Sequence, residues 1–212
     1  MLLFCLGPRD LGEEVNEFRK AVAENNREEI TALATELMDR IPDEEGVPDV
    51  EKSIYAQANN RIFGVVFWFA LLGPVGAWLF RVADLMRRRA LLQRARTSED
   101  TADVSSIPID SVLLCYRIMA WVPSRLLMVG YAMAGNYNGA LAAWRKPPPE
   151  YSDGFHGPDF LLLGVIGCGA AEQNDAADIS ERAQVAMDLV IRTLWMVWCP
   201  VLALLTVYGA LS

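Results

Sequence analysis

The chain carries no charged side chain from residue 63 to residue 80, where it reads FGVVFWFALLGPVGAWLF. An apolar run of about 18 residues is long enough to cross the hydrocarbon core of a bilayer. Residues 81–96 then hold six arginines and one aspartate, and basic residues gathered beside a span mark its cytoplasmic end. The pattern predicts a transmembrane helix over 61–81, with 81–107 in the cytoplasm and 9–60 on the periplasmic side.

A second uncharged run covers 193–212 and predicts another transmembrane helix. Residues 109–135 are also apolar but contain Arg117 and Arg125, and a charge at the bilayer centre is costly. This possible membrane segment is therefore either two short pieces separated at Pro123 or one long helix with its arginines near an interface. Residues 1–8 read as the end of a membrane helix that begins outside this sequence, the alternative being an ordinary apolar terminus.

The region before the first span is acidic, because residues 9–60 hold 14 acidic and 6 basic side chains. Apolar residues at helical spacing form two stripes, one through Val15 and Phe18 and one through Leu33 and Leu37. These stripes predict a helical hairpin with a solvated acidic face. The second helix is expected to begin near Asn26, which precedes an acid by three residues and can cap it. The acidic balance argues against nucleic acid as a partner.

The predicted fold class is therefore all-α: an integral membrane protein with two to three spanning helices, amphipathic or interfacial helices and an acidic helical hairpin. The acidic hairpin occupies 9–60. Residues 82–192 form a polar and amphipathic helical region around the possible membrane segment. Within it, residues 160–171 are uncharged but too few to span, so we expect a buried or interfacial helix there.

The sequence offers little for catalysis or metal binding. Its four cysteines are scattered and it has a single histidine, His156, so no zinc site, catalytic set or cofactor is predicted. The intramembrane arginines Arg117 and Arg125 are candidates for a ligand or interaction site, with snorkelling to an interface as the alternative. Within the first span, Gly73, Pro74 and Gly76 predict a break or a close helix-packing point.

Three stretches resemble the AmpE family of bacterial inner-membrane proteins: residues 60–76, 110–126 and 204–211. The most specific motifs are Trp-Val-Pro-x-Arg-Leu at 121–126 and Leu-Thr-x-Tyr-Gly-Ala-Leu at 205–211. The resemblance covers essentially the whole chain, although family members begin with additional N-terminal membrane sequence. It implies a role in the regulation of β-lactamase induction and in cell-wall sensing, in the bacterial inner membrane as a multi-pass protein.

The AmpE family is in turn similar to cobalamin-pathway amide synthases, which carry a Glu-Asn-x-x-Asp-Gly motif before the matching span. Residues 59–64 align with that motif, and Asn60 and Gly64 match it. The two acids are replaced by Asn59 and Phe63. Loss of both carboxylates removes the side chains expected to bind a metal ion or the phosphates of a nucleotide. The resemblance therefore implies no synthase activity.

Three functions remain open at this stage. The first is a non-enzymatic regulatory or accessory membrane protein of the AmpE type. The second is a structural subunit of a larger membrane complex. The third is a degenerate synthase that keeps a ligand pocket near Asn60, Arg61, Arg117 and Arg125, whose guanidinium groups suit an anionic ligand. Expected partners are membrane lipids and either other membrane proteins or a second copy of the chain.

Overall fold

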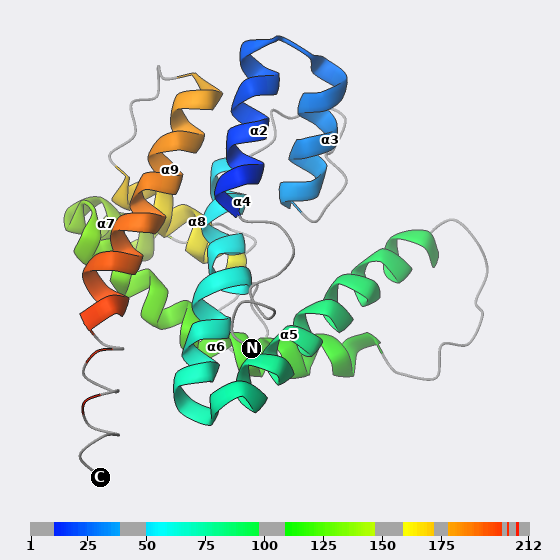
Figure 1. The fold of residues 1–212 in the computed structure, drawn as a ribbon, viewed down its shortest axis with the longest axis vertical. Helices are drawn as coiled ribbons and strands as arrows, with labels where there is room; N and C mark the ends of the chain where they lie inside the picture. The colour runs from blue at the N-terminus through cyan, green and yellow to red at the C-terminus, as the bar shows by residue number, and fades with distance from the viewer. Residues whose placement is uncertain are drawn as a thin grey trace.

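The computed structural model describes residues 11–38, 50–97, 109–146, 159–171 and 178–200, together with residues 203 and 207. Within these ranges all the regular structure is helical, with no strand, which confirms the predicted fold class (Figure 1). The predicted end of a membrane helix at 1–8 lies outside the described residues, as do His156 and half of the predicted span at 193–212. Two of the described helical stretches are long and apolar enough to cross a membrane by length and composition.

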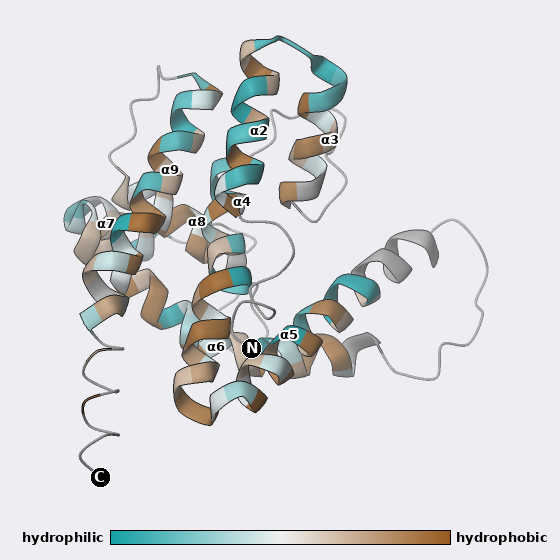
Figure 2. Cartoon of the chain, viewed as in Figure 1, coloured by the Kyte–Doolittle hydropathy of each residue, from teal (hydrophilic) through white to brown (hydrophobic). Residues whose placement is uncertain are grey.

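The acidic hairpin is formed by α2 (Leu11–Ala23) and α3 (Arg27–Met38), which lie side by side in Figure 1. The Asn26 side chain accepts a hydrogen bond from the Glu29 amide at 3.4 Å and donates one to the Glu29 carboxylate at 3.0 Å. The first of these bonds makes Asn26 an N-cap of α3, and it confirms the predicted start of the second helix. Figure 2 shows hydrophilic residues concentrated on these two helices.

The next helical stretch combines α4 (Val50–Ala58), a π-helical turn η1 (Asn59–Phe63) and α5 (Gly64–Thr97). The helix expected over 61–81 is present but is not straight, because Gly73 leaves helical geometry with φ 68° and ψ −155°. A residue without a Cβ adopts such angles readily, and Pro74 follows. The predicted break is thus confirmed at Gly73, and Figure 1 shows the chain changing direction there.

The second half of the chain supplies α6 (Ile109–Ala134), α7 (Tyr137–Arg145), α8 (Asp159–Ala170), α9 (Ile179–Thr193) and a second π-helical turn η2 (Leu194–Trp198). Of the two alternatives for 109–135, the structure shows one long helix, with Pro123 inside it. The helix over 160–171 is short and largely buried, as expected. Its Gly167 lies against the ring of Tyr55 on α4, so a small residue is needed for that close approach.

The main hydrophobic core lies between α2, α4, α6, α8 and α9. Tyr55 and Tyr131 are fully buried at its centre, where their rings meet edge to face at 5.1 Å between centroids. A second, smaller core lies between the two parts of α5 and α6 and contains Val65, Phe80 and Ala120. Burial of large apolar side chains is the main term that holds such helices together. The polar residues described next lie at the edge between the two cores.

Candidate functional site

A group of buried and half-buried polar residues gathers where η1 meets α2, the second part of α5, and α6. We call this group the polar cluster. Its members are Glu14, Gln57, Asn59, Asn60, Arg61, Arg81, Asp84, Arg87, Arg88 and Tyr116. Ionisable side chains are rarely buried unless they are paired, so the contacts within this group decide what it can do.

The π-helical turn η1 places three consecutive polar residues in the cluster. Asn59, Asn60 and Arg61 are all buried. A π-helical turn holds an extra residue compared with an α-helical turn, and such turns occur frequently at functional sites. The turn therefore directs side chains into the protein that an ordinary α-helix would distribute around its axis.

Arg61 connects η1 to α2 of the acidic hairpin. Its Nη1 lies 2.6 Å from Glu14 Oε1, and the two side chains are only 10% and 4% exposed. Its Nε also donates to Gln57 Oε1 at 3.3 Å, and Gln57 Nε2 donates to the carbonyl of Leu37 on α3 at 3.2 Å. These bonds tie α2, α3 and α4 together at one point. One carboxylate oxygen, Glu14 Oε2, is buried without a hydrogen-bond partner among the described residues.

Asp84 is the fully buried acid at the other side of the cluster. Arg87 Nη2 lies 2.9 Å from its Oδ1, and Arg88 Nε lies 3.1 Å from its Oδ2. Arg81 adds a longer contact of 3.5 Å. These arginines lie three or four positions away on the same helix, where side chains face one another. Arg88 also donates to Gln57 Oε1 at 3.2 Å, which joins the Asp84 group to the Arg61 group.

The third side of the cluster comes from α6. The Tyr116 hydroxyl donates to Asn60 Oδ1, and the Arg87 guanidinium lies 4.8 Å from the centroid of the Tyr116 ring. A cation over an aromatic face is attracted by the ring's charge distribution. The neighbouring Asn59 Oδ1 is buried with no hydrogen-bond partner in the described part of the chain.

The structure brings together two of the four predicted ligand candidates. Asn60 and Arg61 both lie in the polar cluster. Arg117 is half buried on α6, and no hydrogen bond or ion pair joins it to a described residue of the cluster. Arg125 lies further along α6, where its guanidinium is 5.9 Å from the ring centroids of both Trp121 and Trp144. The four residues therefore do not line one common pocket.

The three residues predicted to pack helices have different roles. Gly76 does make a close approach, because a side chain there would meet the backbone carbonyl of Trp68. Nothing lies within 4 Å of the position of a Cβ on Gly73, so this glycine serves the bend rather than helix packing. Pro74 is exposed next to it.

Sequence reasoning missed two acids of the cluster. Glu14 was expected on the solvated face of the hairpin, yet it is 3% exposed. Asp84 was counted only as the single aspartate among the arginines of 81–96, although the arginines at helical spacing around it were a signal that could have identified it. The contact from Glu14 to Arg61 joins residues 47 positions apart, and no local pattern announces it.

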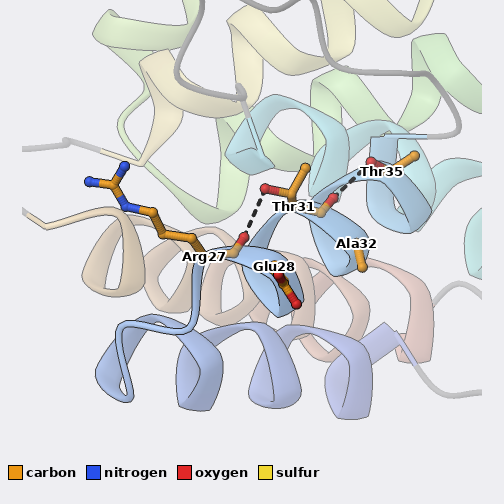
Figure 3. A pocket seen from close by; sticks show the side chains of 5 residues that line it. All are labelled: Arg27, Glu28, Thr31, Ala32 and Thr35. Carbon is orange, nitrogen blue, oxygen red and sulfur yellow. Dashed lines mark hydrogen bonds between the residues drawn. The ribbon is translucent and has the colours of Figure 1, made fainter.

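Two other features lie outside the cluster. Glu51 is buried beside Cys168, whose Sγ donates to it at 3.3 Å, and Arg182 Nε lies 2.8 Å from the same carboxylate. An open depression on α3 is lined by residues of that single helix, and its Thr31 and Thr35 hydroxyls donate to backbone carbonyls one turn earlier (Figure 3). In the first feature the Glu51 carboxylate is bonded to Cys168 and Arg182, and the second is lined by a single helix.

The chemistry open to the polar cluster follows from its charges. Arginines outnumber acids there, so the cluster suits an anionic group, and guanidinium groups bind carboxylate or phosphate in a fixed geometry. Each arginine that faces Asp84 or Glu14 is, however, already bonded to that acid. Among the described residues no three His, Cys, Asp or Glu side chains come together in a metal-binding arrangement. The cluster is thus a bonded network that links α2, α3, α4, α5 and α6 through η1.

Comparison with curated proteins finds relatives of two kinds. Protein AmpE of Shigella flexneri is 27% identical over 221 aligned positions, which cover 99% of this chain and 72% of that protein. Cobalamin biosynthesis protein CobD of Stutzerimonas stutzeri is 28% identical and that of Chromobacterium violaceum 26% identical, over 81% and 80% of this chain. The chain spans little more than half of these two CobD proteins, 56% and 55% of their length.

No solved structure gives a significant match. A family model described as "Regulatory signalling modulator protein AmpE" matches residues 1–212, the whole of the sequence. The motifs at 121–126 and 205–211 lie within this match. The chain belongs to the AmpE family.

Proposed function

We propose that this chain is a non-catalytic regulatory component of the bacterial inner membrane that acts in β-lactamase induction. The observation that carries the proposal is the internal pairing of the polar cluster. At the positions where the related synthases carry acids before their span, this chain has Asn59 and Phe63. The acids that remain nearby, Glu14 and Asp84, are held by arginines of the same chain.

This pairing supports a regulatory role because it connects regions that face different surroundings. Arg61 lies in the turn that leads into the apolar segment, and its partner Glu14 lies on the acidic hairpin. A buried ion pair is sensitive to the loss of either partner. A shift of the hairpin on binding a partner would therefore be felt at the start of the apolar segment.

The proposal is tested by deleting the gene in the source bacterium and measuring β-lactamase activity after exposure to a sub-inhibitory β-lactam. We expect the deletion to change the ratio of induced to basal activity, and the wild-type chain to restore it. Arg61→Ala, at an equal level in the membrane fraction, is expected not to restore it. Arg89→Ala is the matched control, because Arg89 is an exposed arginine of the same helical stretch. An unchanged ratio in the deletion strain would contradict the proposal.

A second candidate function is a retained ligand pocket in a degenerate synthase. It is favoured by the match to the two CobD proteins and by the unpartnered Asn59 Oδ1 beside the arginines. Purification in mild detergent, followed by mass spectrometry for proteins and small molecules, separates the possibilities. A stoichiometric protein partner favours the regulatory role or a structural subunit of a larger complex. A bound anionic metabolite without a partner favours the pocket.

A further inference from the structure

The bend of α5 exposes large apolar side chains and no charge. Leu71, Leu72, Val75 and Trp78 are 56–64% exposed, and Leu79 is 43% exposed. Figure 2 shows hydrophobic colouring on both sides of this bend, at the end of the molecule opposite the acidic hairpin. Contiguous exposed apolar residues mark a surface that meets something other than water. The uncharged run from 63 to 80 encloses the bend completely.

The two arms of the bend lie against each other. The Phe80 ring occupies the space where a side chain on Gly64 would lie, and Gly76 lies against the carbonyl of Trp68. At the open end of this bend, away from Gly73, Arg88 on α5 donates to Gln57 on α4 at 3.2 Å. The residues before and after the uncharged run therefore meet at one place.

The length of the arms determines how deep the bend can reach. From Arg61 to Gly73 the chain advances 12 positions, about 18 Å of helix at 1.5 Å per residue. A bilayer's hydrocarbon core is about 30 Å thick. A helix that crossed the hydrocarbon core would hold its two ends about that far apart. Here Gln57 and Arg88, which lie before and after the uncharged run, are joined by a hydrogen bond between their side chains.

We infer that residues 62–80 form a re-entrant hairpin that enters the lipid bilayer and returns to the side from which it came. The acyl chains of one leaflet surround the bend, because its exposed side chains are apolar and uncharged. The exposed Arg89, beyond the open end, is then at the level of anionic headgroups. Pro74 has no backbone N–H, so the bend leaves one donor fewer to satisfy in lipid.

This topology revises the orientation expected from the arginines alone. The acidic hairpin α2–α3 and the arginines of α5 lie on the same side of the membrane instead of on opposite sides. The inference rests on the membrane location proposed above, and on no other part of the proposed function.

Thiol labelling of the full chain tests the hairpin. The native cysteines are replaced by serine, and single cysteines are placed at the exposed positions Glu28→Cys, Arg89→Cys and Val75→Cys. Each is labelled with a membrane-impermeant maleimide in right-side-out and in inverted vesicles. A spin label at Val75→Cys is measured in parallel for collision with oxygen and with a water-soluble nickel complex.

We expect Glu28→Cys and Arg89→Cys to be labelled from the same side, and Val75→Cys to resist labelling from both sides while colliding mainly with oxygen. Labelling of the first two from opposite faces overturns the hairpin. Ready labelling of Val75→Cys, or its disulfide cross-link to a second copy, overturns lipid as the occupant. Recovery of the chain in the soluble fraction overturns both the membrane location and the re-entrant hairpin. Labelling of Glu28→Cys and Arg89→Cys from opposite sides of a membrane that holds the chain overturns the re-entrant hairpin alone.

Discussion

The bend of α5 and the polar cluster at its open end distribute polarity in opposite ways. At the bend, Val75 and Trp78 are apolar and more than half exposed; at the open end, Arg61 is charged and buried, and Asp84 is charged and fully buried. Both regions belong to one continuous helical stretch. A soluble protein places these two kinds of residue the other way round. The inversion fits the inferred placement of the bend in lipid, and it shows that the acids of the cluster are paired within the chain.

The largest effect is expected from breaking the cluster. Arg61→Ala leaves the Glu14 carboxylate buried without its cation, and removal of one partner of a buried ion pair costs about 3–5 kcal/mol. Denaturation in mild detergent measures this as a lowered unfolding midpoint. The double variant Arg61→Leu with Glu14→Leu removes both charges and should recover much of the loss. Equal destabilisation by the single and double variants would show that the pairing is not the cause.

A charge at the bend is expected to have the next largest effect, but only in a bilayer. Val75→Asp places a carboxylate where we infer lipid, and an aspartate at the centre of a membrane helix costs about 2.5–3.5 kcal/mol. In water an exposed surface change of this kind stays within about 0.5 kcal/mol. The measurement compares the membrane-bound fraction of wild type and variant, with Glu28→Asp as a control on the exposed acidic hairpin. Equal membrane fractions would contradict a lipid-facing bend.

The backbone at the bend gives a smaller effect. Gly73→Ala adds a methyl group into open space, so its cost comes only from the positive φ. Strain of this type costs about 1–3 kcal/mol. Thermal unfolding in detergent should show the loss, while Leu72→Ala, a change at an exposed helical neighbour, should shift the midpoint less. A midpoint for Gly73→Ala equal to that of wild type would mean that the chain does not need this bend.

The smallest effect is expected in the acidic hairpin, which faces water and serves as the reference region. Asn26→Ala removes the N-cap side chain at the start of α3, and loss of such a cap costs about 1 kcal/mol. Hydrogen exchange should speed up in the first turn of α3 and stay unchanged at the polar cluster. Faster exchange at Arg61 as well would show that the acidic hairpin and the polar cluster unfold together.

Local patterns predicted much of the helical layout. The cap at Asn26, the break near Gly73 and the short helix over 160–171 all follow from residue types within a few positions of one another. The contact between Asn60 and Tyr116 could not be predicted in this way, because 56 positions separate the two residues. The same holds for Glu14 and Arg61. A charged residue in an acidic helix is usually solvated, so only the packing of α2 against α4 shows that Glu14 is buried.

The predicted ligand pocket illustrates the same limit. Arg117 and Arg125 were grouped with Asn60 and Arg61 because all four lie in or beside apolar runs. The long helix α6 instead carries Arg125 about 14 Å beyond Tyr116 along its axis, nine positions at 1.5 Å each. There it faces Trp121 and Trp144. Two arginines share a site only if the packing of neighbouring helices brings them together. The sequence of α6 alone does not show where its neighbours contact it.

The most direct test of the re-entrant hairpin is the distance, in a bilayer, between one position before it and one position after it. Spin labels at Ser53→Cys and Arg89→Cys, in the full chain with its native cysteines replaced, report that distance by pulsed electron resonance. A straight helix from 53 to 89 would separate these positions by about 54 Å. We expect a single distance of less than half that value, because Gln57 and Arg88 are in contact. A distance near 54 Å would contradict the re-entrant hairpin.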